Sequence, residues 1–180
     1  MNTHAHHLVP PVSERDRIRG LPSAPYTLVE FGDYECPFCG TAHATVEEVR
    51  RQMGEELCFV FRHFPLVDLH PHAALAAEAA EAAGAQGRFW EMHDRLYEHQ
   101  NALEPEDLLA HAAAIRLELV RFSRDLDARV HAPRVQEDVE SGLSSGVEGT
   151  PSFYINGVKH VGRYDVESLM HALQRARKAA

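Results

Sequence analysis

The sequence predicts an α/β fold, and the spacing of apolar residues is the main evidence. Two stretches rich in branched and aromatic side chains, residues 26–31 and 57–64, have the composition of buried strands. Between them, residues 41–53 carry apolar side chains at helical spacing, followed by a turn at Gly54. A strand, a helix and a second strand in this order predict two parallel strands joined by a right-handed crossover.

A hairpin and a helix are expected near the C-terminus. Asn156-Gly157 is the strongest short signal for a two-residue hairpin turn, so residues 152–155 and 158–161 are predicted to pair as antiparallel strands. Asp165 is placed to cap a last amphipathic helix that runs through Leu173.

The middle of the chain, residues 70–130, is predicted to be helical throughout. Four helices are expected, the first one rich in alanine and starting near Pro71, and a further helix follows from Pro133. The aromatic side chains of this region, such as Phe89 and Tyr97, have the spacing of core residues. Its histidines are scattered, with no pair at helical metal-ligand spacing, so none is assigned to a metal.

Residues 1–25 combine histidines, prolines and a charged run, which predicts a mobile arm with one short ordered piece around Ile18. His4, His6 and His7 offer ligands for an adventitious metal, but a solvated polar arm is the favoured interpretation because nothing nearby completes a site.

The overall charge and hydropathy limit the classes of partner that the chain is expected to bind and the compartment in which it is expected. The 180 residues carry a formal net charge of −9, which argues against binding to nucleic acid or to an anionic membrane. No stretch is apolar enough to serve as a secretory signal or to cross a bilayer. A cytoplasmic protein is therefore expected, unless an export signal is missing from this chain.

The candidate reactive group is the pair Cys36 and Cys39, which the sequence places at the turn between the first strand and the helix. A Cys-x-x-Cys pair can close to a disulfide, and the helix dipole favours a thiolate at the helix N-terminus. Pro37 suits the first helical position because no N–H is needed there. The thiolate is the form that attacks disulfides, so Cys36 is predicted to be a reactive cysteine.

Two simpler interpretations concern the cysteines. The pair could be half of a zinc site, but a closed structural site needs four ligands and no second Cys-x-x-Cys follows. The remaining cysteine, Cys58, lies in the second predicted strand and is expected to be a small buried apolar residue. No metal and no other cofactor is predicted.

The order of elements and three motifs resemble the DsbA-like branch of the thioredoxin-fold disulfide oxidoreductases. The motifs are Glu30-Phe31 with Cys36-Pro37-Phe38-Cys39, then residues 61–66 (FRHFPL), then residues 146–151 (GVEGTP). The resemblance implies a thioredoxin fold with a helical insertion between the second strand and the cis-proline half. Residues 26–69 and 131–180 would form the thioredoxin-like domain, and residues 70–130 the inserted helical subdomain.

The resemblance also assigns roles to the matching residues. It implies that Cys36 is the exposed nucleophile and that Cys39 is the buried thiol that resolves the mixed disulfide. Thr150 and a cis Pro151 facing the dithiol would bind an extended substrate peptide, with Pro37 and Phe38 also in contact with substrate.

Glu30 matches the buried carboxylate that accepts or relays the proton of the buried thiol in these proteins. That role is physically reasonable, because a buried carboxyl group has a raised pKa suited to taking a proton. In the simpler alternative, Glu30 points to solvent at the edge of the sheet.

The implied function is thiol–disulfide exchange with disulfide-containing proteins or peptides, with small thiols as redox partners. Whether the chain acts as an oxidase, a reductase or an isomerase stays open. Phe38 carries no charge, and Glu30 and Glu35 add negative potential, so a potential nearer to about −270 mV than to about −120 mV is expected. The alternative function is a redox-sensing or chaperone-like binding module on the same fold.

Overall fold

The computed structural model describes residues 6–176, so the predictions for residues 1–5 (including His4) and 177–180 lie outside the described residues. Two compact units make up the chain. The first, here called the sheet unit, contains the chain up to Gly32, residues 41–62 and the chain from Glu140 onward. The second, the helical unit, contains residues 33–40 and 63–139 and is therefore larger than the predicted insertion of residues 70–130.

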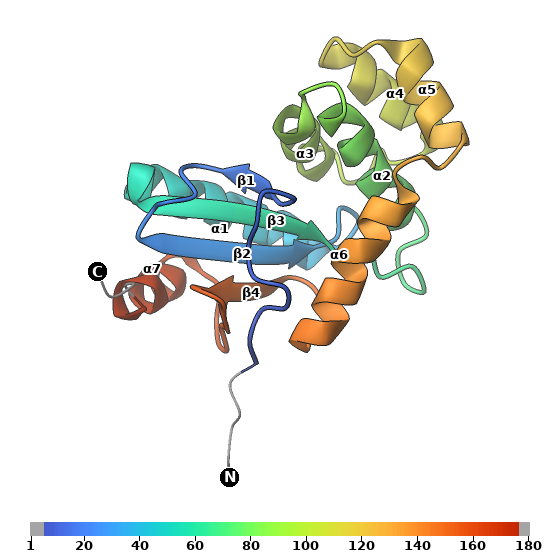
Figure 1. Cartoon of the computed structure of the whole chain (residues 1–180). Coiled ribbons are helices and arrows are strands. Elements are labelled where there is room, and N and C mark those ends of the chain that lie inside the picture. The colour runs from blue at the N-terminus through green and yellow to red at the C-terminus, as the bar shows by residue number, and fades with distance from the viewer. Residues whose placement is uncertain (1–5, 177–180) are drawn as a thin grey trace. The chain divides into compact units, whose positions relative to one another are not determined.

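The sheet unit is built on a five-stranded sheet of order β1-β3-β2-β4-β5 (Figure 1). Every residue of β2 and β3 is buried, as expected for strands whose sequences are nearly continuous apolar runs. The arrows of these two neighbouring strands point the same way in Figure 1, which confirms the predicted parallel pair. The strands are β1 (Arg17–Arg19), β2 (Tyr26–Gly32), β3 (Leu57–His63), β4 (Ser152–Ile155) and β5 (Val158–Lys159).

The predicted hairpin is confirmed in β4 and β5. Asn156 and Gly157 have φ angles of 48° and 83°, and a two-residue turn that matches the strand twist requires positive φ at both positions. The second strand is shorter than predicted and ends at Lys159. The N–H of His160 still donates to the carbonyl oxygen of Phe153 at 2.8 Å, and Val161, at the end of the predicted strand, is 87% exposed.

The two predicted helices of the sheet unit, one after β2 and one after β5, are confirmed. Helix α1 (Pro37–Met53) starts four residues before the predicted helical stretch and is followed by the short 3-10 helix η1 (Gly54–Glu56). Helix α7 (Val166–Arg175) is capped by Asp165, whose carboxylate accepts a hydrogen bond from the backbone N–H of Ser168 at 3.0 Å.

The helical unit confirms the predicted helices of the middle region, and Figure 1 shows α2 to α5 gathered together. The first of them buries most of its alanines, and these small side chains allow α3 and α5 to pack closely against it. Phe89 and Tyr97 are buried, as their spacing predicted. The helices are α2 (Ala73–Gly84), α3 (Phe89–Glu98), α4 (Pro105–Ala114), α5 (Leu119–Asp127) and α6 (Ala132–Ser145), the last of which continues into the sheet unit. Among residues 6–176, no helix has the length and apolar character needed to cross a membrane.

The N-terminal segment is more ordered than the predicted mobile arm, and the ordered piece expected around Ile18 is confirmed as β1. Residues 17–19 form β1, which pairs antiparallel with β3, and Ile18 lies opposite Val60. Closer to the N-terminus, His7 forms a bridge with Val158, and Leu8 is only 6% exposed. Residues 6–25 are therefore part of the sheet unit.

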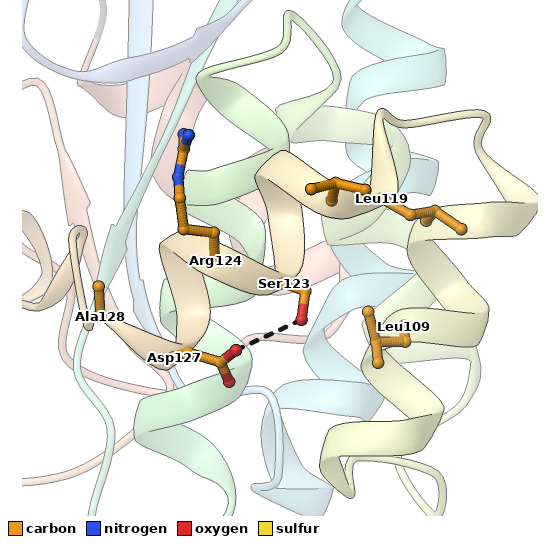
Figure 2. A pocket seen from close by; sticks show the side chains of 7 residues that line it. Leu109, Leu119, Ser123, Arg124, Asp127 and Ala128 are labelled. Carbon is orange, nitrogen blue, oxygen red and sulfur yellow. Dashed lines mark hydrogen bonds between the residues drawn. The ribbon is translucent and has the colours of Figure 1, made fainter.

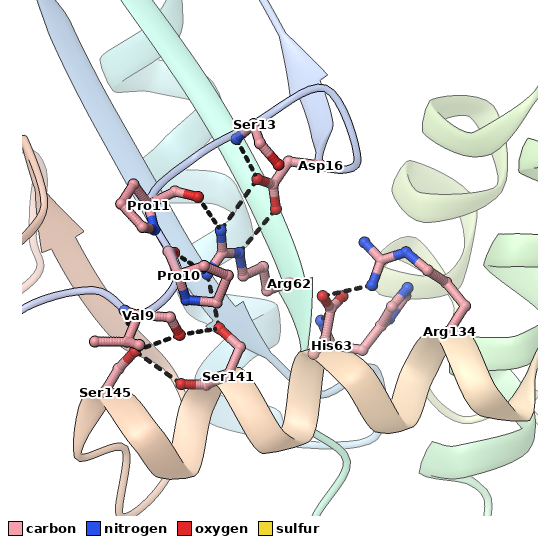
Figure 3. A network of polar contacts seen from close by, with 11 residues as sticks. Val9, Pro10, Pro11, Ser13, Asp16, Arg62, His63, Arg134, Ser141 and Ser145 are labelled. Carbon is pink, nitrogen blue, oxygen red and sulfur yellow. Dashed lines mark hydrogen bonds and ion pairs between the residues drawn. The ribbon is translucent and has the colours of Figure 1, made fainter.

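A buried arginine explains why this segment is held in place. The guanidinium of Arg62 donates from Nε to Oδ1 of Asp16 at 2.8 Å and from Nη2 to Oδ2 of the same carboxylate at 3.0 Å (Figure 3). Its Nη1 also donates to the carbonyl oxygen of Pro10 at 3.0 Å and to Oγ of Ser141 at 2.7 Å. A buried guanidinium needs such partners, and the N-terminal segment supplies most of them.

Candidate functional site

The two cysteines of the motif lie at the start of α1. The carbonyl oxygen of Cys36 accepts the hydrogen bond from Gly40 N at 3.1 Å, and Pro37 is the first residue of the helix. Cys36 and Cys39 lie three positions apart at the start of the helix and are not joined by a disulfide in this structure. Cys36 is only 3% exposed and Cys39 is fully buried, whereas Phe38 between them is 64% exposed. The expectation of an exposed Cys36 is therefore wrong.

Gln100 holds the backbone around the first cysteine. Its Nε2 donates to the carbonyl oxygens of Tyr34 and Cys36, both at 2.9 Å. A Cβ atom added at Gly40 would overlap Oε1 of Gln100. Glycine at this position therefore lets the Gln100 amide reach the start of the helix.

Asp33 connects the turn before the cysteines to a segment more than thirty positions later. Its carboxylate is buried and accepts three hydrogen bonds: from Glu35 N at 2.8 Å, from Leu66 N at 2.8 Å and from Nδ1 of His70 at 2.7 Å. The carbonyl oxygen of Asp33 also accepts the N–H of Cys36 at 3.2 Å. One residue thus fixes both the backbone of Cys36 and the position of the His70 ring.

Two histidines lie beside the motif and form ion pairs with its carboxylates. Partial burial lowers the pKa of His70, but the hydrogen bond and charge of Asp33, with the charges of Cys36 and Glu35, outweigh it, and the net pKa is raised. The pKa of His72 is raised chiefly by its hydrogen bond to Glu35, at 2.8 Å. Both rings therefore favour the protonated, positively charged form.

Sequence reasoning missed Asp33, His70 and His72 as members of the site. Asp33 follows a strand directly and hydrogen-bonds to the N–H two residues later, which is the usual behaviour of an aspartate in a turn. That pattern was available from the sequence. The partnership with His70, 37 positions away, was not, because no local pattern links the two residues.

The remaining predicted residues belong to the sheet unit. Glu30 lies in β2 opposite Phe153 and is 1% exposed, which excludes the alternative of a solvent-facing carboxylate. The peptide bond between Thr150 and Pro151 is cis, and the next residue begins β4. Cys58 is fully buried in β3, as expected for a small apolar residue. The register of β2 and β4 thus brings Thr150 and Pro151 to the strand next to the one that carries Glu30.

Among residues 6–176, no cluster of three or more metal-ligating side chains includes a cysteine. A pocket of about 710 Å³ lies on α4 and α5 (Figure 2). Ser123 donates to Asp127 there at 3.5 Å, and no cysteine or histidine lines the pocket, so it contributes nothing to the chemistry of the dithiol. The pocket is lined by Leu109, Leu119, Val120, Ser123, Arg124, Asp127 and Ala128.

The amino-acid sequence of the chain is similar to those of known proteins. Residues 12–175 match the family model described as thioredoxin. The Na(+)/H(+) antiporter NhaA 1 of Salinispora arenicola is 48% identical over 169 residues, which cover 94% of this chain and 26% of the antiporter. The chain therefore spans about a quarter of the length of the curated relatives it matches.

Solved structures share the fold over most of both chains. BdbD from Bacillus subtilis is 22% identical, with a TM-score of 0.82 over 90% of this chain and 92% of its own. A thioredoxin-like oxidoreductase from Silicibacter pomeroyi is 29% identical, with a TM-score of 0.79 over 93% and 95%. Alpha-DsbA1 from Wolbachia pipientis is 19% identical, with a TM-score of 0.78 over 94% of each chain. The expected DsbA-like thioredoxin fold is confirmed.

Proposed function

Since the chain belongs to the thioredoxin family, we propose that it is a thiol–disulfide oxidoreductase with Cys36 and Cys39 as its redox pair. The observation that carries this proposal is the Cys-x-x-Cys motif at the N-terminus of α1. The positive end of the helix dipole favours a thiolate there, and two thiols one helical turn apart can close to a disulfide.

The proposed reaction has two steps. The Cys36 thiolate attacks one sulfur of a substrate disulfide, which forms a mixed disulfide and releases the other substrate sulfur as a thiolate. The Cys39 thiol then loses its proton and attacks the sulfur of Cys36, which closes the disulfide of the pair and releases the second substrate thiolate. Two electrons pass from the pair to the substrate, and the reverse sequence oxidises a substrate dithiol.

Glu30 is proposed to take up the proton that Cys39 releases. The support is its burial in β2, since a buried carboxyl group favours its neutral form and is suited to exchanging a proton. Its action on Cys39 stays a prediction.

The proposed substrates are disulfide-containing proteins or peptides. In the helical unit, three exposed apolar side chains are available to a substrate. Phe38, inside the motif, is 64% exposed, and Val67 and Leu69, on the segment that Asp33 holds, are 57% and 73% exposed. Pro37 and Phe38 would contact the substrate next to the attacked disulfide. In the sheet unit, the backbone of Thr150, before Pro151, would pair with an extended peptide by strand addition.

The names of the curated relatives describe longer proteins, which are Na(+)/H(+) antiporters. For the matched segment, the thioredoxin match and the cysteine pair favour a redox role. A cytoplasmic site of action stays a prediction from composition.

A turnover assay tests the proposal and separates it from a redox sensor or a chaperone-like module. An oxidoreductase reduces insulin catalytically with dithiothreitol, whereas a sensor reacts only stoichiometrically. Cys36→Ser should abolish turnover and Cys39→Ser should accumulate mixed disulfides, while Cys58→Ser, a matched control at a buried cysteine outside the motif, should keep full turnover. If the wild-type protein reduced insulin only stoichiometrically, the proposed enzymatic function would be refuted.

A further inference from the structure

The thiolate of Cys36 needs a source of positive charge that the motif does not supply. Cys36 is 3% exposed, and burial disfavours the charged form of a thiol. Phe38 is uncharged, and the carboxylates of Asp33 and Glu35 lie in the same turn. The helix dipole, equivalent to about half an elementary charge, is then opposed by both burial and negative charge.

Asp33 links a histidine to the turn that carries Cys36. His70 and Cys36 are bound to the same residue: the His70 ring donates to the Asp33 carboxylate at 2.7 Å, and the Cys36 N–H donates to the Asp33 carbonyl at 3.2 Å. The segment that carries His70 is held a second time, because the N–H of Leu66 donates to the same carboxylate at 2.8 Å. The ring is therefore positioned by contacts that do not depend on substrate.

On this basis, and resting on the function proposed above, we propose that His70, held by Asp33, supplies the positive charge that stabilises the Cys36 thiolate. His70 is thus a positioning residue that acts through the electrostatic potential at the sulfur and forms no covalent bond. In the attack step the Cys36 sulfur provides the electron pair and the substrate disulfide receives it, and His70 keeps its proton throughout.

The charged groups around the ring agree with this role. Asp33, Cys36 and Glu35 are the groups whose negative charges raise the pKa of His70, against the opposing effect of partial burial. The neighbouring His72 is bound instead to Glu35 and to Glu104, at 2.8 Å and 3.1 Å, so that it neutralises carboxylates. The charge of Cys36 acts on the His70 ring, whereas only Glu35 and Glu104 are the charges that act on His72.

The test is the rate of iodoacetamide labelling of Cys36 in the reduced protein, followed by peptide mass spectrometry between pH 5 and pH 9.5. A nearby opposite charge shifts a pKa by about one unit at the low end of its range, and below the pKa one unit is about tenfold in the fraction of thiolate. His70→Asn places an amide nitrogen near the position of Nδ1 and removes the charge. We expect its labelling at pH 6 to be about tenfold slower than that of the wild-type protein, with the two rates converging at high pH.

The convergence separates a charge effect from a structural one, because a distorted site would label slowly at every pH. The matched control is His99→Asn in the same unit, where Nδ1 of His99 hydrogen-bonds to the backbone oxygen of Arg95, at 2.9 Å, and not to a carboxylate. It should label like the wild-type protein. His70→Gln serves as a second uncharged variant if His70→Asn fails to fold by circular dichroism.

Equilibration with glutathione buffers gives a second measurement. Loss of a charge that stabilises the reduced form should shift the equilibrium about tenfold toward the disulfide, which corresponds to about 30 mV toward more reducing potentials. Unchanged labelling and an unchanged equilibrium in a folded His70→Asn protein would overturn the proposal. A pH-dependent loss of labelling in a protein without insulin turnover would sustain His70 and refute the oxidoreductase, because labelling needs no substrate.

Discussion

Replacing Asp16 by asparagine should strongly destabilise the fold by removing the charge that Arg62 is bound to. Both side chains have no exposed surface, and two of the nitrogens of the guanidinium donate to the carboxylate at 2.8 Å and 3.0 Å. Asparagine keeps the size of the side chain, so no cavity forms, and the change isolates the loss of charge.

The size of the effect follows from the burial. Breaking a buried ion pair by removing one partner costs about 3–5 kcal/mol, because the remaining charge stays buried without compensation. Each kcal/mol lowers the Tm of a chain of this length by about 2–4 °C, so a fall of about 6–20 °C is expected.

The measurement is thermal unfolding followed by circular dichroism, with Glu48→Gln as the matched control. Glu48 also forms a close ion pair, with Arg51 at 2.6 Å, but the two side chains are 36% and 71% exposed. Solvent screens such a surface pair, so its loss should leave the Tm close to that of the wild-type protein. If the two variants melted at the same temperature, Arg62 would not be held by Asp16, and the explanation for the ordered N-terminal segment would fail.

Three further predictions concern titratable groups. Asp33→Asn should lower the pKa of His70 in an NMR titration. Because the pKa of His70 is raised in the folded wild-type protein, the contribution of the pair to stability is full below about pH 6.5 and is lost as the pH rises through the folded pKa. A variant whose stability had the same pH dependence as the wild-type protein would contradict the pairing. Iodoacetamide at about pH 6 should label Cys36 well before Cys39 and Cys58, and equal labelling of the three cysteines would contradict the assigned roles. Burial raises the pKa of Tyr154 to about 12, so one of the five tyrosines should stay protonated at about pH 11 in an absorbance titration, and this late step should be missing in Tyr154→Phe.

Local pattern was enough to predict most of the fold. The buried strands β2 and β3, the hairpin at Asn156-Gly157 and the Asp165 cap all follow from residues that are neighbours in sequence, so periodicity and turn chemistry identified them. The cysteine pair at the start of α1 was predicted for the same reason, since a motif at a strand-to-helix turn is itself local.

Three features were decided only by tertiary structure. The N-terminal segment is ordered because Arg62 is bound to Asp16, 46 positions away, and composition cannot reveal such a partner. The burial of Cys36 depends on the packing around the turn and not on the motif. The positive charge near the thiol comes from His70, which Asp33 holds across 37 positions. The two residues between the cysteines therefore could not indicate the charge of the site. Electrostatic potential depends on distance in space and includes groups from every segment that the fold brings near.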